Sequence, residues 1–303
     1  MTRRGFVLFG LMCLIWGIPY LLIRVAVREL SPEMLVFART SIAALLLVPV
    51  AAGRGELGPV IRRWPALLVF AAVEIALPWV LLSSAETHVS SSLAALMIAA
   101  VPLVGAAIAR TTGDRERLGF ASTTGLLVGV AGVAVLVGFD LGGASATALV
   151  ELALVVVGYA VGPLLLARYL AGLPALGVIA VSLGISALVY APIAAFSIPD
   201  GVPSGRVLGS VAGLAIVCTA VAFILFFALI GEIGPVRATV ITYVNPAVAA
   251  LLGVTILDES FTVSMGFGFA LVLLGSALAT RPSRKRPDAA PERLVAGLEA
   301  NSP

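Results

Sequence analysis

Two charged side chains stand inside long apolar stretches, where they could do chemistry that a surface charge cannot. Arg39 lies in the apolar run 32–52, and Glu74 lies near the middle of the run 65–84. If these runs are antiparallel neighbours, we expect the two side chains to form an ion pair or to share a water network. Such a pair can merely fix helix register. Alternatively, Arg39 attracts a carboxylate of a substrate, or Glu74 takes up a proton coupled to transport.

Aromatic residues near the middle of apolar runs form the second group of candidates. Rings with a polar tip can line a cavity, because they stack on apolar or cationic parts of a ligand and hydrogen-bond its polar groups. Taken singly, each is more often a packing residue than a ligand contact. The candidates are Trp16, Tyr20, Trp79, Tyr159, Phe226, Phe227 and Tyr243.

Tyr243, Asn245 and Pro246 form a local constellation within one apolar run. Proline frees a carbonyl one turn earlier in a helix, and Asn245 can either satisfy the backbone or face a substrate. Pro102 is the expected counterpart of Pro246 in an earlier run. Both prolines are interpreted as shaping helices that gate a pathway.

Enzymatic and metal chemistry lack the residues they need. His88 is the only histidine, and Cys13 and Cys218 both lie in apolar runs, so we expect no catalytic residue, no metal site, no cofactor and no disulfide framework. No phosphate-binding loop motif occurs, so ATP does not drive the process directly. The basic residues lie in short loops and form no stripe, which excludes a nucleic-acid partner.

The elements that must position these residues are membrane-spanning helices. Hydrophobic residues make up 60% of the chain and charged residues 12%, and the mean hydropathy is +1.13. Backbone groups in lipid must be satisfied within the segment, which favours helices. Apolar runs of spanning length lie at 5–27, 32–52, 65–84, 89–109, 117–138, 146–167, 174–196, 207–230, 236–256 and 262–280.

The distribution of Lys and Arg predicts an orientation. Of the 19 Lys and Arg residues, 15 lie in segments that face the cytoplasm if the N-terminus is inside, two lie in external loops (Arg28 and Arg206), and two lie within runs (Arg24 and Arg39). This bias predicts a multi-pass protein of the cytoplasmic membrane with both termini in the cytoplasm. The basic stretch 281–303 is expected to be a disordered cytoplasmic tail.

The two halves of the chain repeat one pattern. The stretch from Ser92 to Pro102, the acidic loop ending at Glu116 and a Gly-rich run are matched by Ala238 to Pro246, Asp258-Glu259 and a second Gly-rich run. Five spans per half is an odd number, so the second half enters the membrane in the opposite sense. The prediction is an all-α membrane protein with two inverted five-helix repeats, 5–138 and 146–280, and a substrate site near mid-membrane.

These features resemble the EamA family of the drug/metabolite transporter superfamily. The matching motifs are Leu14-Ile-Trp-Gly17, Arg39, Ala85 through Pro102, Cys218-Thr-Ala, and the block from Ile233 through Asn245-Pro246 to Asp258-Glu259. The resemblance covers about residues 6–280, and Glu74 stands outside its motifs. It implies a helical bundle with a central cavity and transport of small polar or amphipathic metabolites, often by export.

The sequence therefore predicts a secondary transporter and no enzyme. Its expected partners are a small-molecule substrate, such as an amino acid, and the lipid bilayer, with proton coupling as one hypothesis. A flippase for lipids or lipid-linked substrates and a non-transporting membrane scaffold are the alternatives. Glycines spaced four apart, such as Gly158 and Gly162, are interpreted as internal packing, although one such face could form a homodimer.

Overall fold

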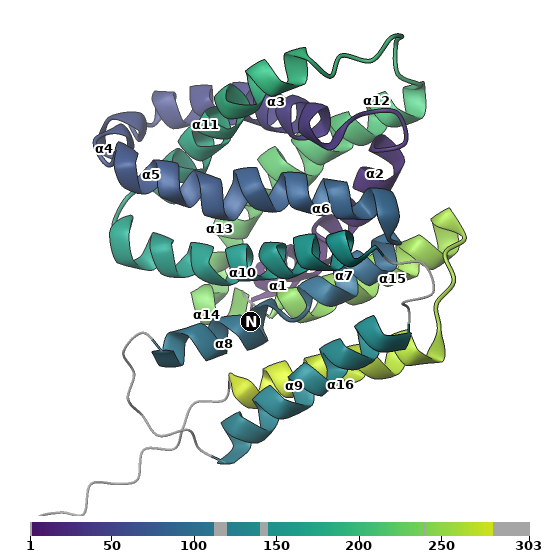
Figure 1. Cartoon of the computed structure of the whole chain (residues 1–303). Helices are drawn as coiled ribbons and strands as arrows, with labels where there is room; N and C mark the ends of the chain where they lie inside the picture. The colour runs from purple at the N-terminus through teal and green to yellow at the C-terminus, as the bar shows by residue number, and fades with distance from the viewer. Residues whose placement is uncertain (1, 112–119, 140–144, 239, 281–303) are drawn as a thin grey trace, which may run out of the picture.

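The computed structural model describes residues 2–111, 120–139, 145–238 and 240–280, and these ranges contain helices and no strand (Figure 1). The predicted tail at 281–303 lies outside the described residues. In chain order the helices are α1 (Arg3–Ile15), α2 (Ile18–Ala26), α3 (Pro32–Gly53), α4 (Leu57–Ile61), α5 (Trp64–Phe70), η1 (Ala71–Ala76), α6 (Leu77–His88), α7 (Ser91–Ile98), α8 (Val101–Thr111), α9 (Phe120–Phe139), α10 (Ala146–Tyr169), α11 (Ala175–Ala195), α12 (Gly205–Ala212), η2 (Gly213–Val221), α13 (Ala222–Ile233), α14 (Pro235–Ala238), α15 (Ile241–Leu257) and α16 (Val263–Ala279).

Seven helices of the described chain are long and apolar enough to cross a membrane. They include Arg3–Ala26, Trp64–His88 and Gly205–Ile233, each of which consists of shorter helices that follow one another directly in the chain. Three further apolar helices, Thr123–Gly138, Ile241–Leu257 and Val263–Ala279, are shorter. All ten predicted apolar runs thus contain a helix, but only seven reach spanning length in the described residues.

Polar residues at the helix starts explain where many of these elements begin. Ser31 caps α3 and is followed by Pro32 at the first helical position, and Ser90 and Thr262 cap α7 and α16 in the same way through their hydroxyls. α15 ends at Asp258, which adopts the left-handed conformation with φ 56°. The loops between apolar runs are therefore set by local sequence.

Two segments are π-helical instead of α-helical: η1 inside the third predicted run and η2 inside the eighth. π-helical turns inside α-helices are rare and frequently occur at functional sites. η1 carries Glu74, and η2 carries Cys218 and Thr219. These segments were not predicted, because a wider turn leaves the apolar pattern unchanged.

The helices pack mainly across the two halves of the chain. α9 lies beside α16 and α3 lies beside α11, at opposite edges of the molecule in Figure 1, and α7 packs on α15. Close approach depends on glycine: a Cβ at Gly125 would lie 2.5 Å from the backbone nitrogen of Ala279. A buried apolar core runs between these pairs and surrounds the polar residues described next.

Candidate functional site

Arg39 lies buried between helices of the bundle. It is buried on α3, its guanidinium lies 3.6 Å from the centroid of the Trp79 ring on α6, and its Nε donates a 3.0 Å hydrogen bond to the Thr219 hydroxyl on η2. A guanidinium stacked on an indole is stabilised by a cation–π interaction, which is strongest away from water. The described hydrogen bonds of Arg39 use only Nε, so its two terminal nitrogens remain available for a ligand.

Glu74 does not form the direct ion pair with Arg39 that the sequence suggested. No ion pair joins the two among the described residues, because Arg39 is turned toward Trp79 and Thr219. The Oε2 atom of Glu74 is buried without a hydrogen-bond partner. The Glu74 carboxylate occupies the space that a side chain at position 162 would need, so Gly162 on α10 leaves room for it. A shared water network stays a prediction.

Tyr20 and Tyr159 complete this central group. Tyr20, on α2, is buried, and Tyr159 lies half-buried on α10, within electrostatic reach of both Glu74 and Arg39. Tyr20 lies within electrostatic reach of Tyr159 and Arg39. The structure thus brings together five of the predicted cavity residues, together with Thr219, which the sequence analysis missed. We refer to Tyr20, Arg39, Glu74, Trp79, Tyr159 and Thr219 as the central cluster.

The predicted aromatic residues Trp16 and Phe226 belong to a second, adjoining group. Trp16 lies at the break between α1 and α2, with its ring centroid 4.7 Å from that of Phe226 and 5.9 Å from that of Phe223, both on α13. Phe223 and Phe227 stack with centroids 6.1 Å apart and also pack against the apolar core that holds Trp79. The aromatic group therefore borders the central cluster on one side.

Asn245 and Tyr243 make contacts of a different kind. With its amide nitrogen turned toward the neighbouring carbonyls, Asn245 donates to Ile241 at 3.0 Å and to Cys13 at 3.1 Å. Of its two predicted roles, the structure favours satisfying the backbone. The Tyr243 hydroxyl lies 3.4 Å from that of Thr280, at the end of α16. Pro246 lies inside α15, whereas Pro102 follows the break between α7 and α8. The two prolines are not structurally alike.

Glu259, in the turn after α15, binds the start of α7. Its Oε1 accepts the Ser91 N–H at 2.8 Å, and its Oε2 accepts the Ser92 N–H at 2.9 Å and the Ser92 hydroxyl at 2.6 Å. A carboxylate is favoured at a helix N-terminus, where backbone N–H groups lack intrahelical partners. This contact joins residues 167 positions apart. We call it the Glu259 latch.

Glu86, near the end of α6, lies within electrostatic reach of Glu259. Its side chain is fully buried, and neither carboxylate oxygen has a hydrogen-bond partner. The guanidinium of Arg24 donates to the backbone carbonyl of Glu86, without forming an ion pair with its carboxylate in the described residues. Two residues before Glu86, Ser84 donates to Glu151 on α10 at 2.8 Å. Glu86 was not predicted, because the predicted run 65–84 stops before it, whereas the apolar helical segment continues to His88.

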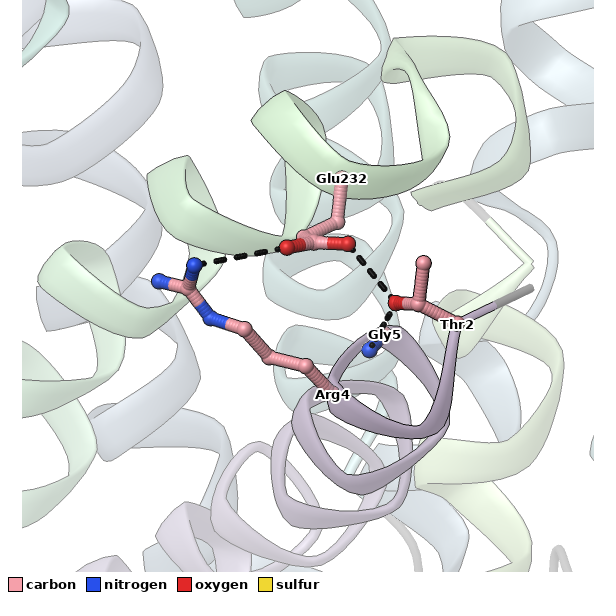
Figure 2. Close-up of polar contacts among 4 residues, drawn as sticks. All are labelled: Thr2, Arg4, Gly5 and Glu232. Carbon is pink, nitrogen blue, oxygen red and sulfur yellow. Dashed lines mark hydrogen bonds and ion pairs between the residues drawn. The ribbon is translucent and has the colours of Figure 1, made fainter.

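Further polar contacts tie the loops together. Glu29 accepts the Ser204 N–H at 2.7 Å, and Glu56 accepts the Gly177 N–H at 2.9 Å. Figure 2 shows Glu232 accepting a 2.8 Å hydrogen bond from Thr2 and lying 3.4 Å from Arg4. Arg4 is largely exposed, so this ion pair contributes little, about 0–1 kcal/mol. The Thr2 hydroxyl also accepts the Gly5 N–H at 3.0 Å and so caps α1.

This arrangement offers groups that suit the binding of a small molecule. The central cluster offers a cation, a carboxylate, two phenols and an indole, all held between helices. Cys13 and Cys218 are buried free thiols, and no group of three potential metal ligands occurs among the described residues. A buried cation beside aromatic rings can hold a small anionic or amphipathic molecule.

Comparison with known proteins places the chain among transporters. The model of the EamA-like transporter family matches residues 3–138 and again 147–281. The chain is 28% identical over 276 residues to the uncharacterized inner membrane transporter YedA of Escherichia coli K12, covering 88% of this chain and 89% of YedA. It is 25% identical to the uncharacterized transporter YvbV of Bacillus subtilis, covering 95% of each.

The fold has also been seen experimentally. The crystal structure of another protein aligns with a TM-score of 0.65 at 23% identity, over 92% of this chain and 97% of the other. At this identity the match shows a common fold alone. Since the family model matches nearly all of the described chain, in two successive stretches, the protein belongs to the EamA-like transporter family.

Proposed function

We propose that the chain is a secondary carrier that exports a small polar or amphipathic metabolite bearing a carboxylate, such as an amino acid. The observation that carries the proposal is Arg39: a buried cation, fixed by Trp79 and Thr219, that forms no ion pair with a carboxylate among the described residues. A buried charge is costly unless paired. A substrate carboxylate would supply the missing partner, while the neighbouring rings contact the rest of the molecule.

Alternating access is proposed to arise from two inverted five-helix repeats. Numbering the predicted runs one to ten, the second pairs with the seventh, the fourth with the ninth and the fifth with the tenth. The third and eighth runs each contain a π-helical segment, and both segments contribute to the central cluster. Such pairing of equivalent members supports a pseudo-two-fold relation between the halves, with the substrate site between them.

The loop contacts support the predicted alternation of the spans, and the excess of Arg and Lys predicts which side faces the cytoplasm. The Glu259 latch and the pair Glu29–Ser204 each join two segments that the predicted topology puts outside. The contacts of Glu56 with Gly177 and of Arg4 with Glu232 each join two segments that the predicted topology puts on the cytoplasmic side. We accordingly propose ten spans, with both termini in the cytoplasm. YedA is described as an inner membrane transporter, and we propose the same membrane for this chain.

Reconstituted vesicles would test the role of Arg39. Purified protein is incorporated into liposomes preloaded with one unlabelled metabolite, and counterflow of the labelled metabolite is measured across a panel of amino acids, amines and neutral solutes. We expect carboxylate-bearing compounds to exchange and amines lacking a carboxylate to fail. Arg39→Gln should abolish exchange, and Arg39→Lys should retain a small part of it, because an ammonium lacks the planar face that stacks on Trp79.

The matched control is Arg28→Gln, which removes an exposed arginine from a loop and should leave exchange unchanged. Full exchange by Arg39→Gln, or equal exchange of amines and carboxylates, would remove the basis of the proposal.

A further inference from the structure

Glu86 is the most completely buried carboxylate without a partner in the described chain. Its side chain has no exposed surface, and both oxygens lack hydrogen bonds. An ionised carboxylate in such a place would cost many kcal/mol, so a buried acid of this kind takes up a proton instead. Ionisable residues inside membrane helices commonly mark ion or proton pathways.

The neighbours of Glu86 act in opposite directions. The Glu259 carboxylate lies within electrostatic reach of Glu86 and accepts three hydrogen bonds from the start of α7. A second negative charge beside it is unfavourable, so Glu86 stays protonated while the latch is closed. Arg24 is the nearby cation, and its guanidinium already reaches the Glu86 backbone carbonyl.

The remaining groups near α6 are placed differently. Glu151 is held by Ser84, Glu74 lies on the preceding η1 segment against α10, and Tyr20 lies within electrostatic reach of both Glu86 and Arg39. Other charged or titratable side chains lie on α6 or on the elements that pack against it. They are Glu33 and Arg39 on α3, Tyr159, Arg168 and Tyr169 on α10, and His88 on α6. Tyr20 is therefore a member of the central cluster that lies within electrostatic reach of Glu86.

We propose that Glu86 is the proton-binding group of this carrier and that the Glu259 latch controls its access to water. When Glu259 leaves the start of α7, water reaches Glu86. The O–H bond breaks, the proton passes to water, and the carboxylate left behind is neutralised by Arg24. Before the latch closes, the Glu86 carboxylate takes a proton from the water that has reached it, and Glu259 then returns to the start of α7. This inference rests on the proposed carrier function and names the coupling ion.

Infrared spectroscopy of the full chain in lipid nanodiscs tests the proton without any substrate. The carbonyl stretch of protonated carboxyl groups is recorded over a pH series from acid to alkaline. In the wild-type chain we expect a band that persists at neutral pH, and Glu86→Gln should lose it. Glu259→Gln removes the neighbouring charge, so the band should disappear at a lower pH than in the wild type. A band lost only in Glu74→Gln, or unchanged in Glu86→Gln, would overturn the proposal.

Glu56→Gln is the matched control, because Glu56 has a hydrogen-bond partner in Gly177 and lies in a different loop. Glu86→Gln should fold as the wild type does, since an amide resembles the protonated acid, and its thermal transition checks this. In vesicles, a metabolite that exchanges in the wild type should still exchange in Glu86→Gln but should no longer accumulate against its gradient when a pH gradient is imposed. If no metabolite exchanges in the wild type, the carrier proposal fails while the infrared result still decides the role of Glu86.

Discussion

The Glu259 latch gives the sharpest stability prediction. Glu259→Ala removes three hydrogen bonds, of 2.8, 2.9 and 2.6 Å, from the first turn of α7. Hydrogen bonds to charged groups contribute about 1.5–3 kcal/mol each, and a carboxylate at a helix N-terminus adds about 0.3–1 kcal/mol. Because Glu259 is only partly buried, water replaces much of what is lost. We therefore expect the free energy of unfolding to fall by about 2–3 kcal/mol, well below the plain sum.

Thermal unfolding of the detergent-purified chain, followed by tryptophan fluorescence, measures this change. A loss of that size lowers Tm on the order of 5–10 °C. Asp258→Asn is the matched control, because it removes the adjacent carboxylate, whose side chain makes no described hydrogen bond, and asparagine tolerates the left-handed conformation at this position. Ser92→Ala alone should cost about 1 kcal/mol, and little more once Glu259 is alanine. Equal Tm values for Glu259→Ala and Asp258→Asn would refute the latch.

Two further perturbations follow from the described contacts. Hydrogen bonds from Ser204 hold the pKa of Glu29 below its ordinary value of 4.5. The contact therefore stabilises the fold above that pH, and this stabilisation is lost as the pH falls through the folded pKa. Glu29→Gln should flatten the acid side of a curve of Tm against pH, and parallel curves for the two proteins would contradict this. A Cβ at Gly158 would lie 2.7 Å from the Val73 carbonyl oxygen, so Gly158→Ala should lower the free energy of unfolding by about 1–3 kcal/mol, measured by thermal unfolding. Gly184 has open space around it, so Gly184→Ala should be neutral or stabilise the protein by up to about 1 kcal/mol. Similar effects at both sites would argue against the close packing at Gly158.

Much of the fold could be predicted because lipid leaves the chain few choices. Backbone groups that cannot reach water must bond within their own segment, so each apolar run becomes a helix. The structure places helices in all ten predicted runs, although three are shorter than a spanning length in the described residues. The breaks at Trp16-Gly17 and at Ala99-Ala100 and the two π-helical segments were not predicted, because they alter turn geometry without altering hydropathy.

The candidate site was predictable as a set of residue types and not as a set of contacts. Arg39, Trp79 and Tyr159 were identified because polar or amphipathic groups are rare and costly in apolar helices. The direct pairing of Arg39 with Glu74 was wrong, since depth in the membrane does not fix the side of a helix on which a residue lies. Thr219 and Phe223 were missed, because a threonine or a phenylalanine in an apolar run carries no signal of its own.

The sequence by itself determined a multi-helix membrane protein of the EamA-like family, since hydropathy, the loop charges and the repeated motifs are all written along one dimension. Only the tertiary structure decided which partners the charged residues take. Arg39 binds Thr219 from 180 positions away, and Glu259 binds Ser92 from 167 positions away. Such contacts depend on how the helices rotate and pack against one another. A helix that is hydrophobic on all sides has no distinct apolar face, so its sequence pattern does not define this rotation. The tertiary structure likewise decided that Glu86 is buried without a hydrogen-bond partner for its carboxylate.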